Sequence, residues 1–342
     1  LSARVFAPQL VNPWAVALLP NGQRVVLDPQ NGFAFLRQTP AGLFISNTGS
    51  EHNHVEFSRF IAIDAPRERM LISHPTDYYG GPHSIRVSDY EGSLDGLYDI
   101  GVYGAGPGQF NDPAGVAVDA DGRIYVADRG NNRVQVLDMD GDFLAQLGGS
   151  GTAAGQFNAP EGIAVSADHR VYVCDRGNQR VQILQFDPVN ETLSYVGVLS
   201  GISLPYPVGV ALASDGTVYV SERNRDVVQV FSAAGQWVQR LSTALYPASG
   251  SFSDPAGLAV DDRGRVIVCD TGNRRVVLAY APEIVGDLDG DHYVNAADLR
   301  VFDDCMQGPG VAPTTGCETA DLDTDTDVDL TDFAELQLLI DD

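Results

Sequence analysis

A single unit of about 47 residues recurs through the first 285 residues of this chain. Its clearest copy, 108–138, combines a Gln-Phe-x-x-Pro-x-Gly element with an Asp-x-x-Asn-x-Arg element. Further copies occupy 155–180, 207–212 and 255–275, and weaker ones occupy 13–18 and 59–64. Each copy contains short runs of alternating apolar and polar residues separated by turn residues, which is the pattern of β-strands. Six such units predict a mainly-β propeller with six blades.

The last copy ends after three predicted strands, near Tyr280. We expect Arg4–Ala7 to supply the missing fourth strand, because closing the ring in this way leaves no unpaired sheet edge. The Gln-Phe-x-x-Pro-x-Gly and Asp-x-x-Asn-x-Arg elements of the unit resemble NHL repeats. The resemblance implies an NHL-like six-bladed propeller, which we assign to residues 1–283.

Two ladders of oxygen-bearing side chains lie 34 residues apart near the C-terminus. The first comprises Asp287, Asp289, Asp291, Tyr293, Asn295 and Asp298. The second comprises Asp321, Asp323, Asp325, Asp327, Asp329 and Asp332. Both follow the ligand spacing of the twelve-residue calcium loop, in which the seventh residue offers its backbone carbonyl. The sequence therefore predicts two bound calcium ions.

An apolar stripe follows each ladder, formed by Leu299 and Phe302 in one case and by Phe333 and Leu336 in the other. This spacing predicts a short amphipathic helix after each loop. Two loop–helix units of this kind resemble a type I dockerin domain, which we assign to residues 284–342. The resemblance implies a small α-helical, EF-hand-like domain that folds around calcium and binds a cohesin partner. The alternative interpretation is a solvated acidic tail.

The four cysteines divide into two pairs. Cys305 and Cys317 bracket a connection rich in Gly, Pro and Thr between the calcium ladders, and we expect them to form a disulfide. Such a bridge stabilises a fold by roughly 3 kcal/mol and implies an oxidising compartment. Cys174 and Cys269 occupy equivalent strand positions and are predicted to be packing residues. A secreted or cell-surface protein of a bacterium is the expectation, although a signal peptide cannot be judged from a chain that starts at Leu1.

The formal net charge is −25. Because such an acidic surface repels phosphate backbones, nucleic-acid binding is excluded as an expectation. All 21 basic residues are arginine, so a catalytic lysine is excluded. No stretch approaches the roughly 20 apolar residues of a membrane-spanning helix.

One end of the propeller is predicted to gather the residues that end the second strand of each unit. These are Asp28, His74, Asp128, Asp175, Glu222 and Asp270. A ring of this kind could hold a cation or an amine. The alternative, which we favour, is that each acidic side chain holds its own turn, with Arg133, Arg180 and Arg275 pairing with neighbouring loops.

The second unit carries His52, His54, His74 and His83, four of the six histidines. Blade topology places them at the same end, where three converging imidazoles could hold zinc. The alternative is that they are ordinary polar loop residues. Trp14, Tyr78 and Tyr79 could instead line a ligand groove at this end.

Taken as a whole, these features predict a secreted, non-catalytic binding or scaffold protein. The propeller would recognise a protein, peptide or polysaccharide, and the C-terminal domain would attach it to a cohesin-type partner or extracellular assembly. One alternative is an enzyme of the NHL-type lyase or lactonase-like class with a metal site at this end, for which Glu161 is a candidate ligand. Another is a structural subunit that self-assembles. The sequence shows no Ser/His/Asp order, phosphate loop or paired-carboxylate motif.

Overall fold

The computed structural model describes residues 10–29, 35–38, 44–48, 58–75, 83–90, 98–242, 250–262 and 264–280, with Phe302, Cys305 and Val328. The chain divides into two units, Leu1–Tyr280 and Ala281–Asp342. Apart from those three residues, the second unit lies outside the described part of the chain. The predicted helices of the dockerin-like domain therefore stay a prediction.

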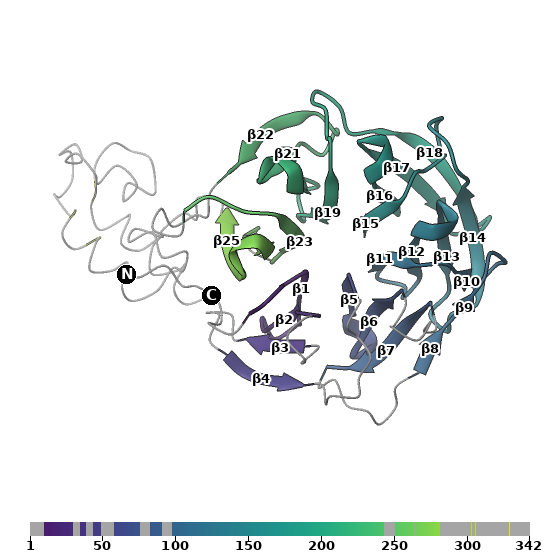
Figure 1. Ribbon diagram of the computed structural model, residues 1–342, viewed down its shortest axis with the longest axis horizontal. Coiled ribbons are helices and arrows are strands. Elements are labelled where there is room, and N and C mark those ends of the chain that lie inside the picture. Colours follow the sequence, from purple (N-terminus) through teal and green to yellow (C-terminus); the bar gives the residue numbers. More distant parts are fainter. Residues whose placement is uncertain are drawn as a thin grey trace. The chain divides into compact units, whose positions relative to one another are not determined.

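The first unit is built from antiparallel sheets whose strands follow one another in chain order, as Figure 1 shows. Five of these sheets have four strands. Their bounds are β1–β4, Ala15–Leu18, Arg24–Leu27, Phe35–Gln38 and Phe44–Thr48; β5–β8, Ile61–Asp64, Arg69–His74, Ser84–Asp89 and Tyr98–Ile100; β11–β14, Pro113–Val118, Ile124–Asp128, Arg133–Leu137 and Phe143–Gly148; β15–β18, Pro160–Val165, Arg170–Asp175, Arg180–Asp187 and Thr192–Val198; and β19–β22, Pro207–Leu212, Val218–Glu222, Val227–Phe231 and Trp237–Leu241.

A further sheet contains β23 (Pro255–Val260), β24 (Val266–Asp270) and β25 (Arg275–Tyr280). The fourth strand expected here, Arg4–Ala7, lies outside the described residues. The predicted mainly-β propeller is confirmed. The count of six complete blades stays a prediction, because only five sheets have four strands in the described part of the chain.

The first strand of each sheet faces the centre of the ring, and these strands contact one another in the order β1, β5, β11, β15, β19, β23 and back to β1. They line a central channel of about 240 Å³ with apolar residues such as Ile61, Ile163 and Leu258. The last and first sheets also touch directly, since the Gly257 amide donates to the Trp14 carbonyl at 2.8 Å. Contact between these sheets therefore closes the ring around the channel.

The core lies between neighbouring sheets. Because the middle strands are covered on both faces, they are continuous apolar runs such as Ile124–Ala127, in which every residue is buried. Tyr125 meets Phe186 of the next sheet edge-on, with ring centroids 5.9 Å apart. The outermost strands are more exposed, as in β22, where Trp237 is 39% exposed. This layering is typical of a propeller, in which each sheet packs only on its two neighbours.

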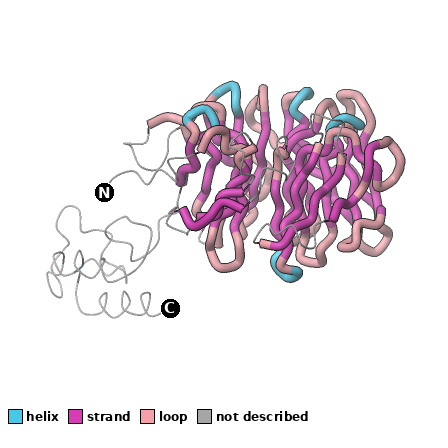
Figure 2. The backbone as a smooth tube through the Cα atoms, turned by 60° about the horizontal axis from the view of Figure 1, so that its bottom comes forward, coloured by secondary structure: helices cyan, strands magenta, loops and turns pink. Residues whose placement is uncertain are grey.

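A short 3₁₀ turn follows the second strand in four of the sheets. These turns are η2 (Arg129–Asn131), η3 (Arg176–Asn178), η4 (Arg223–Arg225) and η6 (Thr271–Asn273). They lie at one end of the strands, whereas η1 (Ala65–Arg67) lies at the opposite end (Figure 2). The remaining pair, β9 (Val102–Tyr103) and β10 (Gln109–Phe110), is a small parallel ribbon that leads into β11.

Candidate functional site

The Asp-x-x-Asn-x-Arg element forms a self-contained clamp around one carboxylate. In the sheet β11–β14, Asp128 Oδ1 accepts a hydrogen bond from the Asn111 amide at 2.8 Å. Its Oδ2 accepts from Asn131 Nδ2 at 2.9 Å, Arg133 Nε at 2.7 Å and Gln135 Nε2 at 3.2 Å. The carboxylate thereby ties the 3₁₀ turn to the segment that enters the sheet.

Arg133 extends this clamp to the incoming loop. Its guanidinium donates to the carbonyls of Ala105 at 2.8 Å and Gly106 at 2.9 Å. Asp175 with Arg180, and Asp270 with Arg275, repeat the ion pair at 2.8 and 2.6 Å. The predicted structural role of these carboxylates is confirmed, and so is the pairing of the arginines with neighbouring loops.

Two of these buried carboxyl groups have raised pKa values. Burial raises the pKa of Asp128, and the hydrogen bonds from Asn111, Asn131 and Arg133 offset only part of that rise. Burial likewise raises the pKa of Glu222, which receives a side-chain hydrogen bond from Gln229 at 2.8 Å. Among the described residues, no three His, Cys, Asp or Glu side chains are grouped so that they could hold a metal ion.

The Pro-x-Gly element of four sheets, and the equivalent tripeptides 13–15 and 58–60 of the first two, place one side chain from each sheet at the channel end next to the 3₁₀ turns. The register confirms this position, because Pro113, Pro160, Pro207 and Pro255 each lie opposite the residue that ends the second strand. The residues at the variable position are Trp14, Arg59, Ala114, Glu161, Val208 and Ala256. Three of the six are therefore large or charged.

The glycine after the variable position allows the inner strands to approach closely. A Cβ on Gly162 would lie 2.3 Å from the Val208 carbonyl oxygen, and one on Gly115 would lie 2.4 Å from that of Glu161. Gly209 and Gly257 show the same close approach to the next sheet. The narrow channel end thus depends on the absence of a side chain at these positions.

Arginines from three sheets converge on Glu161 at this end. Arg59 Nη1 donates to Glu161 Oε1 at 2.9 Å. Arg129 Nη1 and Arg176 Nη1 lie 3.6 and 3.5 Å from Glu161 Oε2. The Glu161 side chain is only 1% exposed, whereas Arg59 and Arg176 are 25% and 27% exposed. We call this group the channel mouth. It also includes Arg223 and the acidic and aromatic residues paired to the arginines, which are Asp112, Asp254, Tyr206 and Trp14.

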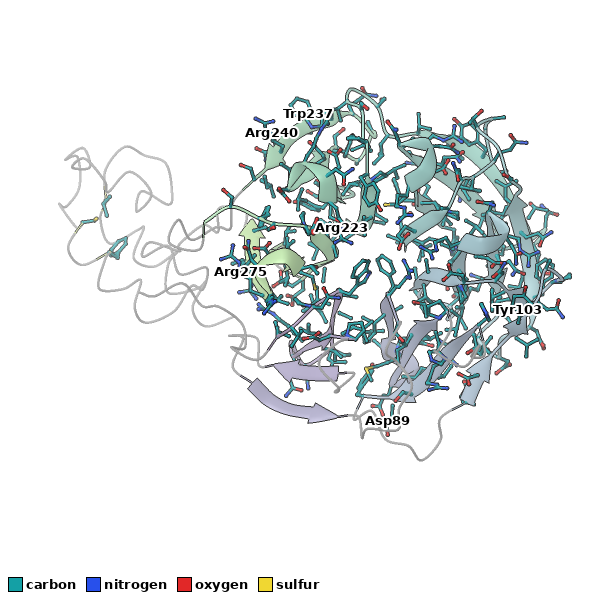
Figure 3. The ribbon with its side chains drawn as sticks, in the orientation of Figure 1. Asp89, Tyr103, Arg223, Trp237, Arg240 and Arg275 are labelled. Carbon is teal, nitrogen blue, oxygen red and sulfur yellow. The ribbon has the colours of Figure 1, made fainter. Side chains whose placement is uncertain are left out.

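Two acidic and two aromatic residues complete the channel mouth. Arg129 forms an ion pair with Asp112, and Arg223 Nη2 lies 3.2 Å from Asp254 Oδ2. The guanidinium carbons of Arg176 and Arg223 lie 4.9 Å above the ring of Tyr206 and 4.8 Å above the ring of Trp14. Figure 3 shows Arg223 toward the centre of the ring, whereas Trp237, Arg240 and Tyr103 lie at its periphery.

The charges of the mouth hold Arg129 firmly in its cationic form. Burial alone would lower the pKa of Arg129, but the neighbouring carboxylates of Glu161 and Asp112 raise it overall. Four guanidiniums thus face three carboxylates, those of Glu161, Asp112 and Asp254. In the described part of the chain, these seven side chains together carry one net positive charge, whereas the formal net charge of the whole chain is −25.

The predicted histidine site is only partly described. His52 and His54 lie outside the described residues. His74 ends β6 and is 1% exposed. His83 has a left-handed backbone with φ of 47°, and its Nδ1 accepts the Asp112 amide at 2.8 Å. The ring also packs on Tyr103 at 4.8 Å, so the Nδ1 of His83 serves the contact between two sheets.

The same linking role belongs to Asn132, which follows η2 with φ of 53°. Its Oδ1 accepts the Ala159 amide of the next sheet at 2.8 Å. His83 is thus the equivalent of Asn132 in an irregular blade, a role that the sequence pattern did not indicate. Tyr78 and Tyr79 lie outside the described residues, and Trp14 is in the mouth.

Most of the remaining predicted sites fall on the second unit. Both calcium ladders, from Asp287 to Asp298 and from Asp321 to Asp332, lie outside the described residues apart from Val328, which is buried. Cys305 is 4% exposed, and Cys317 lies outside the described residues, so their disulfide stays a prediction. Cys174 and Cys269 are buried free thiols, and burial raises the pKa of each. The described residues contain no helix with the length and apolar character required to span a membrane.

Sequence reasoning singled out Glu161 and Trp14 but missed the arginines around them. A signal was present, because Arg129, Arg176 and Arg223 all occupy the first position after the acidic residue that ends the second strand. Arg59 occupies the position equivalent to the variable residue of Pro-x-Gly, where most sheets have a small or apolar residue. Comparing the units position by position would have placed all four at one end of the channel.

Both family resemblances are confirmed by comparison with family models. The NHL repeat model matches residues 110–137, 157–184 and 252–277. The matched ranges omit 207–231, where Glu222-Arg-Asn-Arg-Asp-Val227 replaces the Asp-x-x-Asn-x-Arg element. The Dockerin type I domain model matches residues 285–340. Dockerin domains are of a calcium-binding type, bind cohesins, and occur in extracellular bacterial proteins.

Individual NHL-repeat proteins are similar to short stretches of this chain. The chain is 51% identical over 49 residues to NHL repeat-containing protein 3 of Homo sapiens, which covers 14% of each protein. It spans only 9% and 14% of the length of the first curated relatives it matches.

Solved structures with a similar fold include an enzyme and a binding protein. A gluconolactonase from Xanthomonas campestris matches with a TM-score of 0.61 and 18% identity over 81% of this chain and 88% of that one. An auxiliary nutrient binding protein from Bacteroides thetaiotaomicron matches with a TM-score of 0.60 and 12% identity, over 80% and 70%.

Proposed function

We propose that this chain is a secreted, non-catalytic binding protein whose propeller recognises a ligand and whose C-terminal domain attaches it to a cohesin-type partner. In this proposal the propeller has six complete blades and spans residues 1–283, with Arg4–Ala7 as the closing strand. Residues 284–342 form a helical domain around two calcium ions, one held by the ladder from Asp287 and one by the ladder from Asp321. Cys305 and Cys317 bridge the two calcium units.

The observation that carries this proposal is the match of residues 285–340 to the Dockerin type I domain. Ten side chains and two backbone carbonyls of this segment follow the ligand spacing of calcium loops. Carboxylates repel one another until a cation binds among them, so calcium binding and folding of the domain are coupled. A domain of this kind gives the propeller a point of attachment.

The channel mouth supports recognition as the role of the propeller. Its guanidiniums are partly exposed, are positioned by carboxylates and aromatic rings, and surround the entrance of the central channel. The gluconolactonase is 18% identical to this chain, so the likeness concerns the fold and provides no argument for an enzymatic activity. No observation on the described residues favours a lyase or lactonase activity over binding.

The proposal is tested by capture of the full chain on an immobilised panel of type I cohesin modules. We expect capture in calcium, loss of capture in EGTA, and loss in the double variant Asp287→Ala/Asp321→Ala. The control is Asp341→Ala/Asp342→Ala, which removes the same charge outside the ladders and should be captured like the parent. No calcium-dependent capture by any module, together with no calcium uptake in calorimetry, would refute the proposal. Calcium-dependent self-association without capture would favour the structural-subunit alternative.

A further inference from the structure

The channel mouth has more hydrogen-bond donors than its own acceptors use. A guanidinium has five N–H donors. Among the hydrogen bonds of the described residues, the Arg59 side chain donates once, to Glu161 Oε1, and the Arg176 side chain donates none. Glu161 Oε2 is buried and has no hydrogen-bond partner among the described residues, although Arg129 and Arg176 lie within 3.6 Å of it.

Within the described residues, Arg176 has no acidic partner besides Glu161, which it shares with Arg59 and Arg129. Arg129 is paired with Asp112, and Arg223 lies near Asp254. Asp112 and Asp254 each directly precede the first strand of a sheet. The residues at the same position in the two sheets near Arg176 are Ala159, before β15, and Tyr206, before β19, and Arg176 stacks on the ring of Tyr206. The ring fixes the position of the guanidinium but does not neutralise it. Arg176 therefore shares Glu161 with two other arginines.

From these observations we infer that the channel mouth binds a single carboxylate group of a ligand between Arg59 and Arg176, above Glu161. This inference rests on the proposed function, because it specifies the chemistry that the propeller recognises. Among the residues that the structure describes, the four guanidiniums of the mouth exceed its three carboxylates by one positive charge, which the carboxylate of a ligand would neutralise. Its planar pair of oxygens also matches the fork of a guanidinium.

A carboxylate fits the site better than a cation or a polyanion does. A cation would meet the net positive charge of the mouth and the exposed sides of Arg59 and Arg176. A polymer of many negative charges would be repelled by the rest of a chain that carries −25. The ligand class is thus a small molecule or a chain end with one carboxylate, presented either by a sugar acid or by a peptide C-terminus.

Two matched pairs of probes test this in the full chain by ligand-observed NMR titration. The first pair is galacturonate and neutral galactose, and the second is N-acetylalanine and N-acetylalaninamide. We expect at least one acid to bind at millimolar concentration and its neutral counterpart not to bind. The acid that binds identifies the source of the carboxylate. If neither acid binds better than its neutral counterpart, the inference is wrong.

Three variants then locate the binding site. Arg176→Gln should weaken binding of the acid by about fivefold or more, because it removes a cation without a close carboxylate partner. Glu161→Gln should strengthen binding by about threefold or more, because it keeps the shape and removes the competing charge. The control Arg170→Gln makes the same charge change at the opposite end of the strands, at a side chain 44% exposed, and should bind like the parent.

The opposite signs separate recognition from a purely structural role. A structural role for the cluster would make both mouth variants weaker, and this result would overturn the inference, as would equal binding by Arg176→Gln and Arg170→Gln. Circular dichroism melting verifies that each variant folds, and Arg59→Gln replaces Arg176→Gln if the latter does not fold. Cohesin capture of the same samples keeps the two proposals apart, since loss of carboxylate binding with capture intact refutes only this inference.

Discussion

Replacing Asp128 with asparagine should destabilise the propeller by about 3 kcal/mol, because this removes the charge of a buried ion pair. Asp128 is fully buried and receives four hydrogen bonds, one of them from Arg133 Nε at 2.7 Å. In the variant, an amide NH₂ would face either the donors on Oδ2 or the Asn111 amide. Breaking a buried pair costs about 3–5 kcal/mol, and we expect the lower end because burial already raises the pKa of Asp128.

The measurement is urea unfolding at pH 7, followed by far-UV circular dichroism. The matched control is Asp138→Asn, at a partly exposed turn where Asp138 Oδ1 accepts only the amides of Asp140 and Asp142. Since an asparagine carbonyl still accepts these bonds, the control should remain within about 0.5 kcal/mol of the parent. A difference between the two variants of less than about 1 kcal/mol would refute the view that the clamp stabilises the sheet.

Three further predictions follow from other parts of the fold. The variant Glu222→Gln should be at least as stable as the parent at pH 7, and its stability should depend less on pH. The raised pKa of Glu222 provides stability that is complete below the unfolded pKa of 4.5 and is lost as the pH rises through the folded pKa. The melting temperatures at pH 7 and pH 5 should therefore differ less in the variant than in the parent. Gly162→Ala should lower the free energy of unfolding by about 2 kcal/mol or more, because the new Cβ would lie 2.3 Å from the Val208 carbonyl oxygen. The control Gly197→Ala, whose Cβ would have nothing within 4 Å, should melt close to the parent, and equal melting of the two variants would show that the inner strands can separate freely. Deletion of residues 1–9, which keeps buried Leu10, should lower the melting temperature sharply if Arg4–Ala7 completes the last sheet, and an unchanged melting temperature would exclude that strand.

The strands and the clamps could be predicted because their determinants are local. Asp128, Asn131 and Arg133 lie within six residues of one another, and their spacing recurs in other units. The alternation in Arg133–Leu137 is likewise a property of one strand, so it can be read without knowledge of the neighbouring sheets.

The channel mouth could not be predicted in the same way, because its members come from different sheets. Arg59 and Glu161 are 102 residues apart and meet only when the sheets assemble around the channel. His83 shows a second limit of the sequence pattern. An imidazole indicates metal binding only if both its position and its free nitrogen are known, and the left-handed backbone that directs His83 Nδ1 toward Asp112 is not evident from residue type.

The Pro-x-Gly frame has a consequence for how such molecules diverge. Within each Pro-x-Gly element, strand register constrains the proline, and the close approach of the adjacent backbone constrains the glycine. Neither constraint acts on the residue between them. Glu161, Val208 and Ala256 show how different its occupants can be without altering the scaffold. Successive duplications of the unit thus surround one aperture with residues that the scaffold leaves variable, and substitutions there can change which ligand enters while the architecture is inherited intact.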